Sequence, residues 1–172
     1  QIAKKHKLLR GVKIIVELCS APGGWTQVLR EMDNSLEIVA VDLDQMKPIQ
    51  QVSFIQGDIT TEEILEEIRQ RTRGSVDLVL SDCSPKVSGH WDLDVARQLI
   101  LAERTLEIGQ LLLRQGGKVL TKVFQGSGFQ EFMASAKKKF RSVKLIKPAA
   151  SRKSSAEIYL LATDPIEQSH ER

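Results

Sequence analysis

The chain has 172 residues, of which 41% are hydrophobic and 27% are charged, the balance of an ordinary globular protein. This length supports one full core and is too short for two, so we expect a single domain over residues 1–172, with a loose tail after about residue 164. No apolar run approaches the length that crosses a bilayer, and no signal peptide is visible, which excludes a membrane-spanning protein and leads us to expect a cytoplasmic monomer.

The two cysteines, Cys19 and Cys83, each follow a predicted strand. One pair in a chain of this size is not a disulfide framework. We therefore expect both to be reduced thiols.

The net charge of +3 is unevenly distributed along the chain. Residues 1–13 carry five lysines and arginines and residues 137–153 carry eight, with no acidic residue in either segment, so the rest of the chain is net acidic. Two basic segments on an acidic body suggest a localised anionic partner, most simply a nucleic-acid backbone. The alternative is a solvated surface that serves solubility.

Short apolar runs with β-branched residues predict seven strands. They are 13–18, 37–42, 52–56, 76–81, 118–123, 143–146 and 158–162. Several are too continuously apolar to have one wet face, which is typical of a parallel sheet covered on both sides.

Helical patterns separate most of these strands. A helix over residues 60–71 is predicted to open with a capping box formed by Thr60 and Glu63, and a longer one over residues 93–114 to end at Gly116 and Gly117. Alternating strands and helices predict an α/β fold with a mostly parallel sheet and helices on both faces. Residues 147–156 show no helical period, so we expect the last strand to be antiparallel.

Polar side chains stand where the predicted strands end. In such folds, ligands bind outside the carboxyl ends of the strands. A single acid there is readily explained as a helix cap or a turn residue, but five polar strand ends on one rim favour a binding site. These residues are Glu17, Asp42, Asp58, Asp82 and Lys122.

A glycine loop, "LCSAPGGW", follows the first predicted strand. Gly23 and Gly24 let a ligand approach the backbone, and the next helix presents free N–H groups. No Gly-Lys-Ser/Thr follows, which excludes a Walker loop, and the dinucleotide fingerprint lacks its third glycine. Asp42, 18 residues beyond Gly24, is placed to accept hydrogen bonds from a ribose diol. These features favour a nucleoside cofactor without a pyrophosphate, and S-adenosylmethionine is the common one that fits.

Asp58 is then a candidate acceptor for the adenine amino group. Trp25 either packs at the cofactor or is a core aromatic.

Lys122 ends an apolar strand in "TKVFQGSGF", where burial is costly unless the ammonium is paired. A partly desolvated lysine can act as a base, whereas most lysines keep a wet head group. Glu157, which begins the last strand in "SSAEIYLLA", is expected to meet Lys122 across the rim, either functionally or as a surface ion pair.

These motifs, in this order, resemble the FtsJ (RrmJ-type) family of RNA ribose 2′-O-methyltransferases from Ile2 to about Thr163. The segments that carry the resemblance are "LCSAPGGW", "VDLDQMKP", "QGDIT", "SDCSPKVSG", "TKVFQGSGF" and "KPAASRKSSAEIYLLA". The resemblance implies a Rossmann-like methyltransferase fold with a seven-stranded mixed sheet. It also implies methyl transfer from S-adenosylmethionine to a ribose hydroxyl of RNA, most simply a uridine of 23S-type rRNA, by a metal-free enzyme.

The family uses a Lys-Asp-Lys-Glu tetrad. By motif, its last three members fall on Asp82, Lys122 and Glu157, and the cofactor contacts on Gly23, Trp25, Asp42, Asp58 and Asp82. Gln1 and Ile2 match the end of the segment that carries the first lysine, so we expect that lysine upstream of residue 1. Glu17 stands where the family usually has Asp, which preserves the carboxylate.

Three alternatives stay open at this point. The substrate is tRNA instead of rRNA; the protein is a non-catalytic RNA-binding or assembly factor that kept the fold; or it is a nicotinamide-dependent oxidoreductase, against which the incomplete glycine fingerprint argues.

Overall fold

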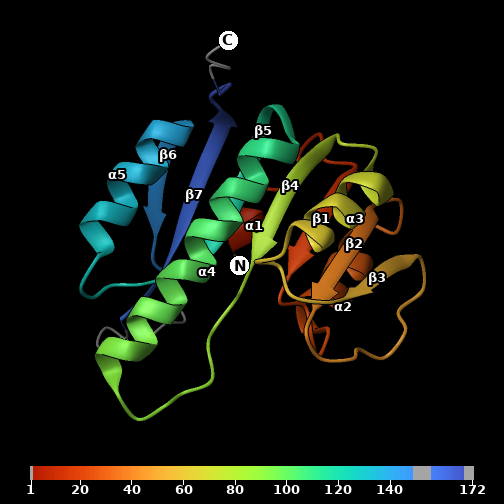
Figure 1. Ribbon diagram of the computed structural model, residues 1–172. Helices are drawn as coiled ribbons and strands as arrows, with labels where there is room; N and C mark the ends of the chain where they lie inside the picture. Colours follow the sequence, from red (N-terminus) through yellow and green to blue (C-terminus); the bar gives the residue numbers. More distant parts are fainter. Residues whose placement is uncertain (1, 149–155, 169–172) are drawn as a thin grey trace.

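A computed structural model describes residues 2–148 and 156–168 (Figure 1). Its elements are α1 (Ile2–Lys5), β1 (Ile14–Leu18), α2 (Gly24–Met32), β2 (Glu37–Asp42), β3 (Val52–Gln56), α3 (Glu62–Thr72), β4 (Val76–Ser81), α4 (Trp91–Leu112), β5 (Leu113–Phe124), α5 (Phe129–Lys139), β6 (Phe140–Ile146) and β7 (Glu157–Pro165). Within these residues, no helix is both long and apolar enough to span a membrane.

The strands form one seven-stranded sheet in the order β3-β2-β1-β4-β5-β7-β6. Strands β1 to β5 pair in parallel, and β7 runs antiparallel to both β5 and β6. The predicted antiparallel last strand is therefore confirmed. It is inserted between β5 and β6, a position that the sequence did not indicate.

Both faces of the sheet are covered, which explains the continuous apolar runs. Val16, Val79 and Val119 point toward the face covered by α3, α4 and α5 (Figure 1). Ile15 and Leu78 point to the opposite face, which packs against Leu8 of the N-terminal segment and Leu29 of α2. The fold is thus the expected α/β sheet with helices on both sides.

The start of α3 differs from the prediction by one residue. Thr61 is its N-cap, and the Thr61 side chain accepts a hydrogen bond from the backbone N–H of Ile64 (3.3 Å). Thr60 is not the cap, because its N–H and hydroxyl both donate to Asp58 Oδ1, at 2.9 and 2.7 Å.

The end of α4 also differs. Leu113 leaves the helix and pairs with Val76 of β4, so β5 begins five residues earlier than the predicted residue 118. Gly116 and Gly117 consequently lie inside β5 and do not terminate the helix. Gly109 has a separate role in α4: a Cβ there would lie 2.4 Å from Val119 Cγ2, so only glycine lets α4 lie this close to β5.

Candidate active site

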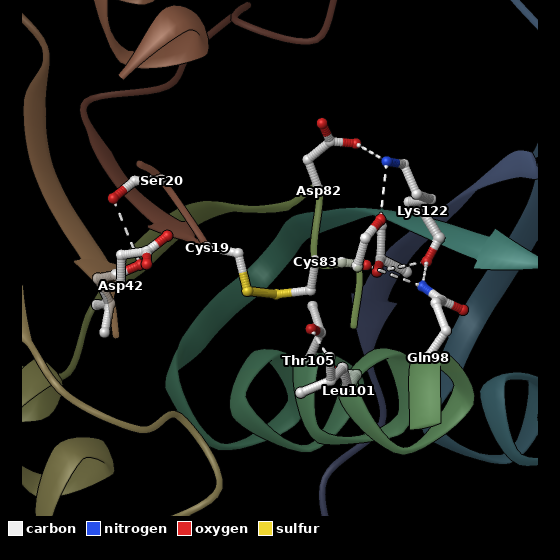
Figure 2. Close-up of a disulfide and its surroundings, with 12 residues drawn as sticks. Cys19, Ser20, Asp42, Asp82, Cys83, Gln98, Leu101, Thr105 and Lys122 are labelled. Carbon is white, nitrogen blue, oxygen red and sulfur yellow. Dashed lines mark hydrogen bonds and ion pairs between the residues drawn. A yellow bond between two sulfur atoms is a disulfide. The ribbon is translucent and has the colours of Figure 1, made fainter. Parts of the chain in front are cut away.

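Lys122, Asp82 and Glu157 meet at the carboxyl ends of β4 and β5. Lys122 Nζ lies 3.1 Å from Asp82 Oδ1 (Figure 2). It also lies 4.0 Å from Glu157 Oε1 and donates to Ser84 Oγ at 3.2 Å. The Lys122 side chain is only 11% exposed. The expected meeting of Lys122 and Glu157 is confirmed, and the two carboxylates and the hydroxyl supply the partners that a nearly buried ammonium needs.

Tyr159 also belongs to this cluster, although sequence reasoning missed it. Its hydroxyl donates to Asp82 Oδ1 at 2.8 Å, and Tyr159 is the register partner of Lys122 in the β5–β7 pairing. Burial, followed by the negative charge of Asp82, raises the pKa of Tyr159. Tyr159 therefore stays a protonated donor that fixes the Asp82 carboxylate. Its place two residues after Glu157 in a strand was the available signal, since alternate residues share a face.

Gln98 of α4 hydrogen-bonds to the backbone just after β4 and at the end of β5. Its side chain is fully buried. Its Nε2 donates to the backbone carbonyls of Cys83 (3.2 Å) and Lys122 (2.8 Å), and its Oε1 accepts from the N–H of Phe124 (2.9 Å) (Figure 2). Both amide atoms of one side chain thus hold the backbone on either side of the Asp82–Lys122 pair.

The glycine loop lies beside this cluster at the end of β1. Gly23 is buried with φ +114°, and a Cβ there would approach Met46 Sδ and Ile49 Cδ1 to 3.2 Å. A side chain at this position is therefore both strained and crowded. Asp42 at the end of β2 holds the loop, because its Oδ2 accepts the N–H of Ala21 (2.9 Å) while Oδ1 accepts the N–H of Asp44 (2.8 Å).

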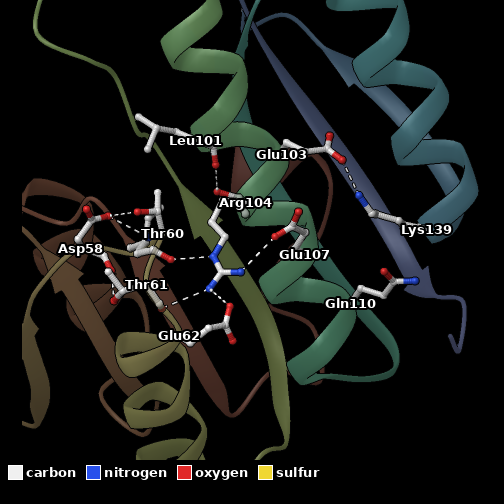
Figure 3. Close-up of polar contacts among 12 residues, drawn as sticks. Asp58, Thr60, Thr61, Glu62, Leu101, Glu103, Arg104, Glu107, Gln110 and Lys139 are labelled. Carbon is white, nitrogen blue, oxygen red and sulfur yellow. Dashed lines mark hydrogen bonds and ion pairs between the residues drawn. The ribbon is translucent and has the colours of Figure 1, made fainter. Parts of the chain in front are cut away.

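Asp58 occupies the loop after β3, and α4 anchors this loop. Arg104 Nε donates to the carbonyl of Ile59 (2.8 Å), and its Nη2 donates to the carbonyl of Thr61 (3.3 Å) (Figure 3). The hydrogen bonds from the backbone and side chain of Thr60 lower the pKa of Asp58. Asp58 therefore remains a carboxylate, which can only accept hydrogen bonds.

Glu17 is the most perturbed carboxyl of the rim. It is 3% exposed, and its Oε2 accepts the hydroxyl of Thr26 of α2 at 2.5 Å. Burial, helped by the charges of Asp82 and Asp42, raises the pKa of Glu17 to about 7 against the opposing effect of the Thr26 hydrogen bond. The carboxyls of Glu17, Asp82 and Asp42 are close enough to interact electrostatically. Their combined negative charge favours a bound cation at the rim.

Cys19 and Cys83 form a disulfide, so the expectation of two reduced thiols is wrong (Figure 2). The cysteines follow β1 and β4, which are neighbours in the sheet, and their Cα atoms lie 5.1 Å apart. The prediction rested on the number of cysteines and did not use strand order. The bridge joins the loop that carries Gly23 to the segment that carries Asp82.

Trp25 lies on the face of the sheet that α1 covers. Its ring packs on Tyr159 with the ring centres 6.0 Å apart. Both rings border an apolar cavity of about 340 Å³ that Leu80, Leu120 and Pro148 also line. Trp25 thus contacts the Tyr159 that holds Asp82, and a role at the cofactor remains a prediction.

The lysines at the end of α5 do not lie at the rim. Lys137, Lys138 and Lys139 are the last residues of α5 and precede β6, so they lie at the opposite end of the sheet from Lys122 (Figure 1). Lys139 pairs with Glu103 at 2.5 Å, and Arg141 pairs with Asp164 at 3.3 Å. Arg152 and Lys153 lie outside the described residues, as do residues 169–172 of the expected tail and the side chains of Lys4 and Lys5.

The rim fits S-adenosylmethionine. Asp42 at the end of β2 and Asp58 in the loop after β3 are carboxylates, which are able to accept hydrogen bonds from ribose hydroxyls and from an adenine amino group. The glycine loop admits close approach, and the acidic rim at Glu17 and Asp82 suits a cationic sulfonium. Across residues 2–148 and 156–168, no group of three or more His, Cys, Asp or Glu side chains is arranged to hold a metal ion.

Comparison with known proteins gives the family. The model of FtsJ-like methyltransferases matches residues 1–164. The chain belongs to this family. Membership decides against the oxidoreductase alternative and confirms the resemblance and the expected fold.

Several curated relatives carry the name ribosomal RNA large subunit methyltransferase E. The protein from Methanothrix thermoacetophila is 45% identical over 94% of this chain, and this chain spans 63% of that relative. The protein from Archaeoglobus fulgidus is 42% identical over 94% of this chain and 83% of its own length.

Solved structures agree on the fold. A protein from Plasmodium falciparum assigned as a ribosomal RNA methyltransferase superposes with a TM-score of 0.84 at 25% identity, covering 97% of this chain and 94% of its own. Human methyltransferase-like protein 13, solved in complex with SAH, superposes with a TM-score of 0.68 at 11% identity, covering 97% of this chain and 77% of its own, and shows the fold alone.

Proposed function

We propose that this member of the FtsJ-like family transfers a methyl group from S-adenosylmethionine to a ribose 2′-hydroxyl of RNA, most simply a uridine of large-subunit rRNA. The observation that carries the proposal is the nearly buried Lys122, held between Asp82 and Glu157 at the rim. The names of the curated relatives support rRNA as the substrate. We expect the protein to act in the cytoplasm as a monomer.

The chemistry requires a base, because a ribose hydroxyl is a poor nucleophile at neutral pH. Bound S-adenosylmethionine supplies an electrophilic methyl group on a sulfonium. Lys122 would accept the hydroxyl proton as the hydroxyl oxygen attacks the methyl group. Asp82 and Glu157 then stabilise the ammonium that results.

Positioning supplies much of the remaining acceleration. Tyr159 and Lys122 both bond to Asp82 Oδ1, which leaves Asp82 little freedom to move. Asp42 at the end of β2 and Asp58 in the loop after β3 each accept a backbone N–H, so the residues proposed for the cofactor and for the base are held near neighbouring strand ends.

The basic residues are proposed to bind RNA phosphates. The seven residues of β6 span about 20 Å, at about 3.3 Å per residue, between the lysines of α5 and the rim. An RNA that contacts Lys137 and Lys138 while its ribose reaches Lys122 must therefore extend along this edge of the sheet. Reversing the charge of these two lysines tests this: weaker RNA binding with a lower salt dependence is expected. An unchanged salt dependence would show that these lysines form a solvated surface and do not contact RNA phosphates.

The decisive experiment is transfer of a tritiated methyl group from S-adenosylmethionine, with ribosomal subunits, free rRNA and bulk tRNA as separate acceptors. Label on a ribose 2′-oxygen of rRNA is the expected result. Label in tRNA keeps the reaction and changes the substrate. Cofactor binding without label in any acceptor contradicts the proposed reaction and favours a non-catalytic RNA-binding factor.

A further inference from the structure

Trp91 and Phe124 form a stacked aromatic pair at the rim. Their ring centres lie 5.7 Å apart, with an angle of 13° between the planes. Trp91 is the first residue of α4 and remains 52% exposed. One face of the indole thus rests on Phe124, while much of the ring stays open to solvent.

Hydrogen bonds hold the two backbone segments that carry Phe124 and Trp91. Phe124 is held through its N–H by the buried Gln98. On the other side, the buried carboxylate of Asp94 accepts the N–H of Ser88 with both oxygens, at 3.1 and 3.2 Å, and the N–H of His90 donates to Ser88 Oγ at 3.1 Å. The loop that leads into Trp91 is therefore pinned to the first turn of α4, so the exposed ring has a defined position.

The pair borders the candidate catalytic cluster. Phe124 lies two residues beyond Lys122 on β5 and is the register partner of Glu157. Ser84, which accepts from Lys122, lies in the loop of residues 82–90 that leads into Trp91. The same loop exposes Lys86 and Val87, so a cation and an apolar side chain accompany the ring.

We propose that Trp91 is a stacking platform for an unpaired nucleobase of the substrate RNA, next to the nucleotide whose ribose is methylated. This inference rests on the proposed function. Proteins that bind single-stranded RNA stack bases on exposed aromatic rings and hold the backbone with nearby cations. An open indole that follows a loop with an exposed lysine, Lys86, and stacks on Phe124 two residues from Lys122 has these components.

The platform is tested by RNA binding, without reference to methyl transfer. The chain has two tryptophans, so the fluorescence of the wild type is compared with that of Trp91→Phe during titration with a single-stranded oligoribonucleotide of 10 to 12 mixed-sequence nucleotides. We expect quenching in the wild type that is mostly lost in Trp91→Phe. For Trp91→Ala we expect the Kd to rise about tenfold or more, the usual effect of removing one stacked base.

Two further readouts separate stacking from a general defect. Trp91→Leu keeps an apolar contact with Phe124 and loses the flat ring, so its Kd should rise like that of Trp91→Ala. The dependence of Kd on salt should stay at the wild-type slope in both variants, because no phosphate contact is removed. Ile100→Ala, which removes an exposed apolar side chain further along α4, should bind like the wild type.

The outcomes distinguish this inference from the proposed function. Wild-type affinity in Trp91→Ala and Trp91→Leu, or quenching that persists in Trp91→Phe, overturns the platform and leaves the methyl transfer proposal standing. RNA binding through Trp91 with no methyl transfer by the wild type upholds the platform and overturns the reaction. A wild type whose fluorescence does not respond to RNA also overturns the platform.

Discussion

The side-chain amide of Gln98 donates a 2.8 Å hydrogen bond to the backbone carbonyl of Lys122, which couples the middle of α4 to the candidate base. Gln98→Leu removes the partner of one buried carbonyl, one part-buried carbonyl and one part-buried N–H, and an unsatisfied buried group costs about 1 to 3 kcal/mol. We expect a lower free energy of unfolding and at least a tenfold lower kcat, with little change in KM for either substrate. Urea denaturation and steady-state kinetics check this.

Thr105→Val is the matched control. Thr105 is a buried polar residue of the same helix, but its hydroxyl donates only to the carbonyl of Leu101 in α4, at 2.9 Å. It should lower stability without lowering kcat. If Gln98→Leu and Thr105→Val lose the same stability and the same kcat, the result would contradict a positioning role for Gln98.

Lys122→Ala should abolish methyl transfer and leave the affinity for S-adenosylmethionine nearly unchanged, because Asp42 and Asp58 keep their own backbone hydrogen bonds when the Lys122 side chain is removed. Calorimetric titration with the cofactor, beside the tritium assay, checks both parts. Parallel loss of binding and transfer would make Lys122 a structural residue.

Asp42→Ala should have the reverse effect and weaken cofactor binding first. The substitution removes the acceptor proposed for the ribose diol and releases the N–H of Ala21 in the glycine loop. A calorimetric Kd for S-adenosylmethionine at least tenfold higher than in the wild type is expected. Asp42→Asn retains an acceptor oxygen and should lose less. A normal Kd in Asp42→Ala would contradict the ribose assignment.

Stability of the cofactor-free protein should depend on pH through Glu17. An unfolded chain releases this proton near pH 4.5, whereas the folded protein holds it to about pH 7. The folded state therefore binds more protons between these values, and stability falls as the pH rises through this window. Since one pKa unit is worth about 1.4 kcal/mol, the fall amounts to about 3 kcal/mol.

Glu17→Gln has no titrating side chain at position 17, so its free energy of unfolding should not show this fall with pH. Urea denaturation of both proteins at intervals from pH 4.5 to 8 measures the difference. Superimposable stability profiles for the two proteins would show that Glu17 does not titrate in this range.

The Cys19–Cys83 disulfide should stabilise the fold. The bonded cysteines are 64 residues apart, and closing a loop of this length in the unfolded chain is worth about 4 kcal/mol on the chain-entropy model. Dithiothreitol should lower the free energy of unfolding of the wild type and leave the double variant Cys19→Ser, Cys83→Ser unchanged. Alkylation of both cysteines in denatured protein without reductant would show that they are thiols.

The sequence was most informative where burial on both faces imposes one pattern. The predicted ranges overlap all seven strands, and β1, β2 and β4, which are buried over most of their length, follow from continuous apolar runs. The meeting of Lys122 with Glu157 was also predictable, because an antiparallel last strand returns its first residue to the rim.

What could not be predicted depends on which elements become neighbours. The disulfide required knowing that β4 pairs with β1. Gln98 reads as one more polar residue of a helix, and its role follows only from the contact of α4 with two strand ends. The early end of α4 is likewise a tertiary effect, because Leu113 gains a partner in Val76 and the glycines no longer set the boundary.

The insertion of β7 between β5 and β6 imposes an order on synthesis and folding. Among the described strands, β6 pairs only with β7, so residues 140–146 have no partner until residues 157–165 have left the ribosome. Until then β5 presents an open edge, the kind of surface that pairs with other chains. The strand that delivers Glu157 and Tyr159 to the rim is also the one that covers the edge of β5, so a nascent chain completes its candidate catalytic cluster only when β5 stops being an open edge.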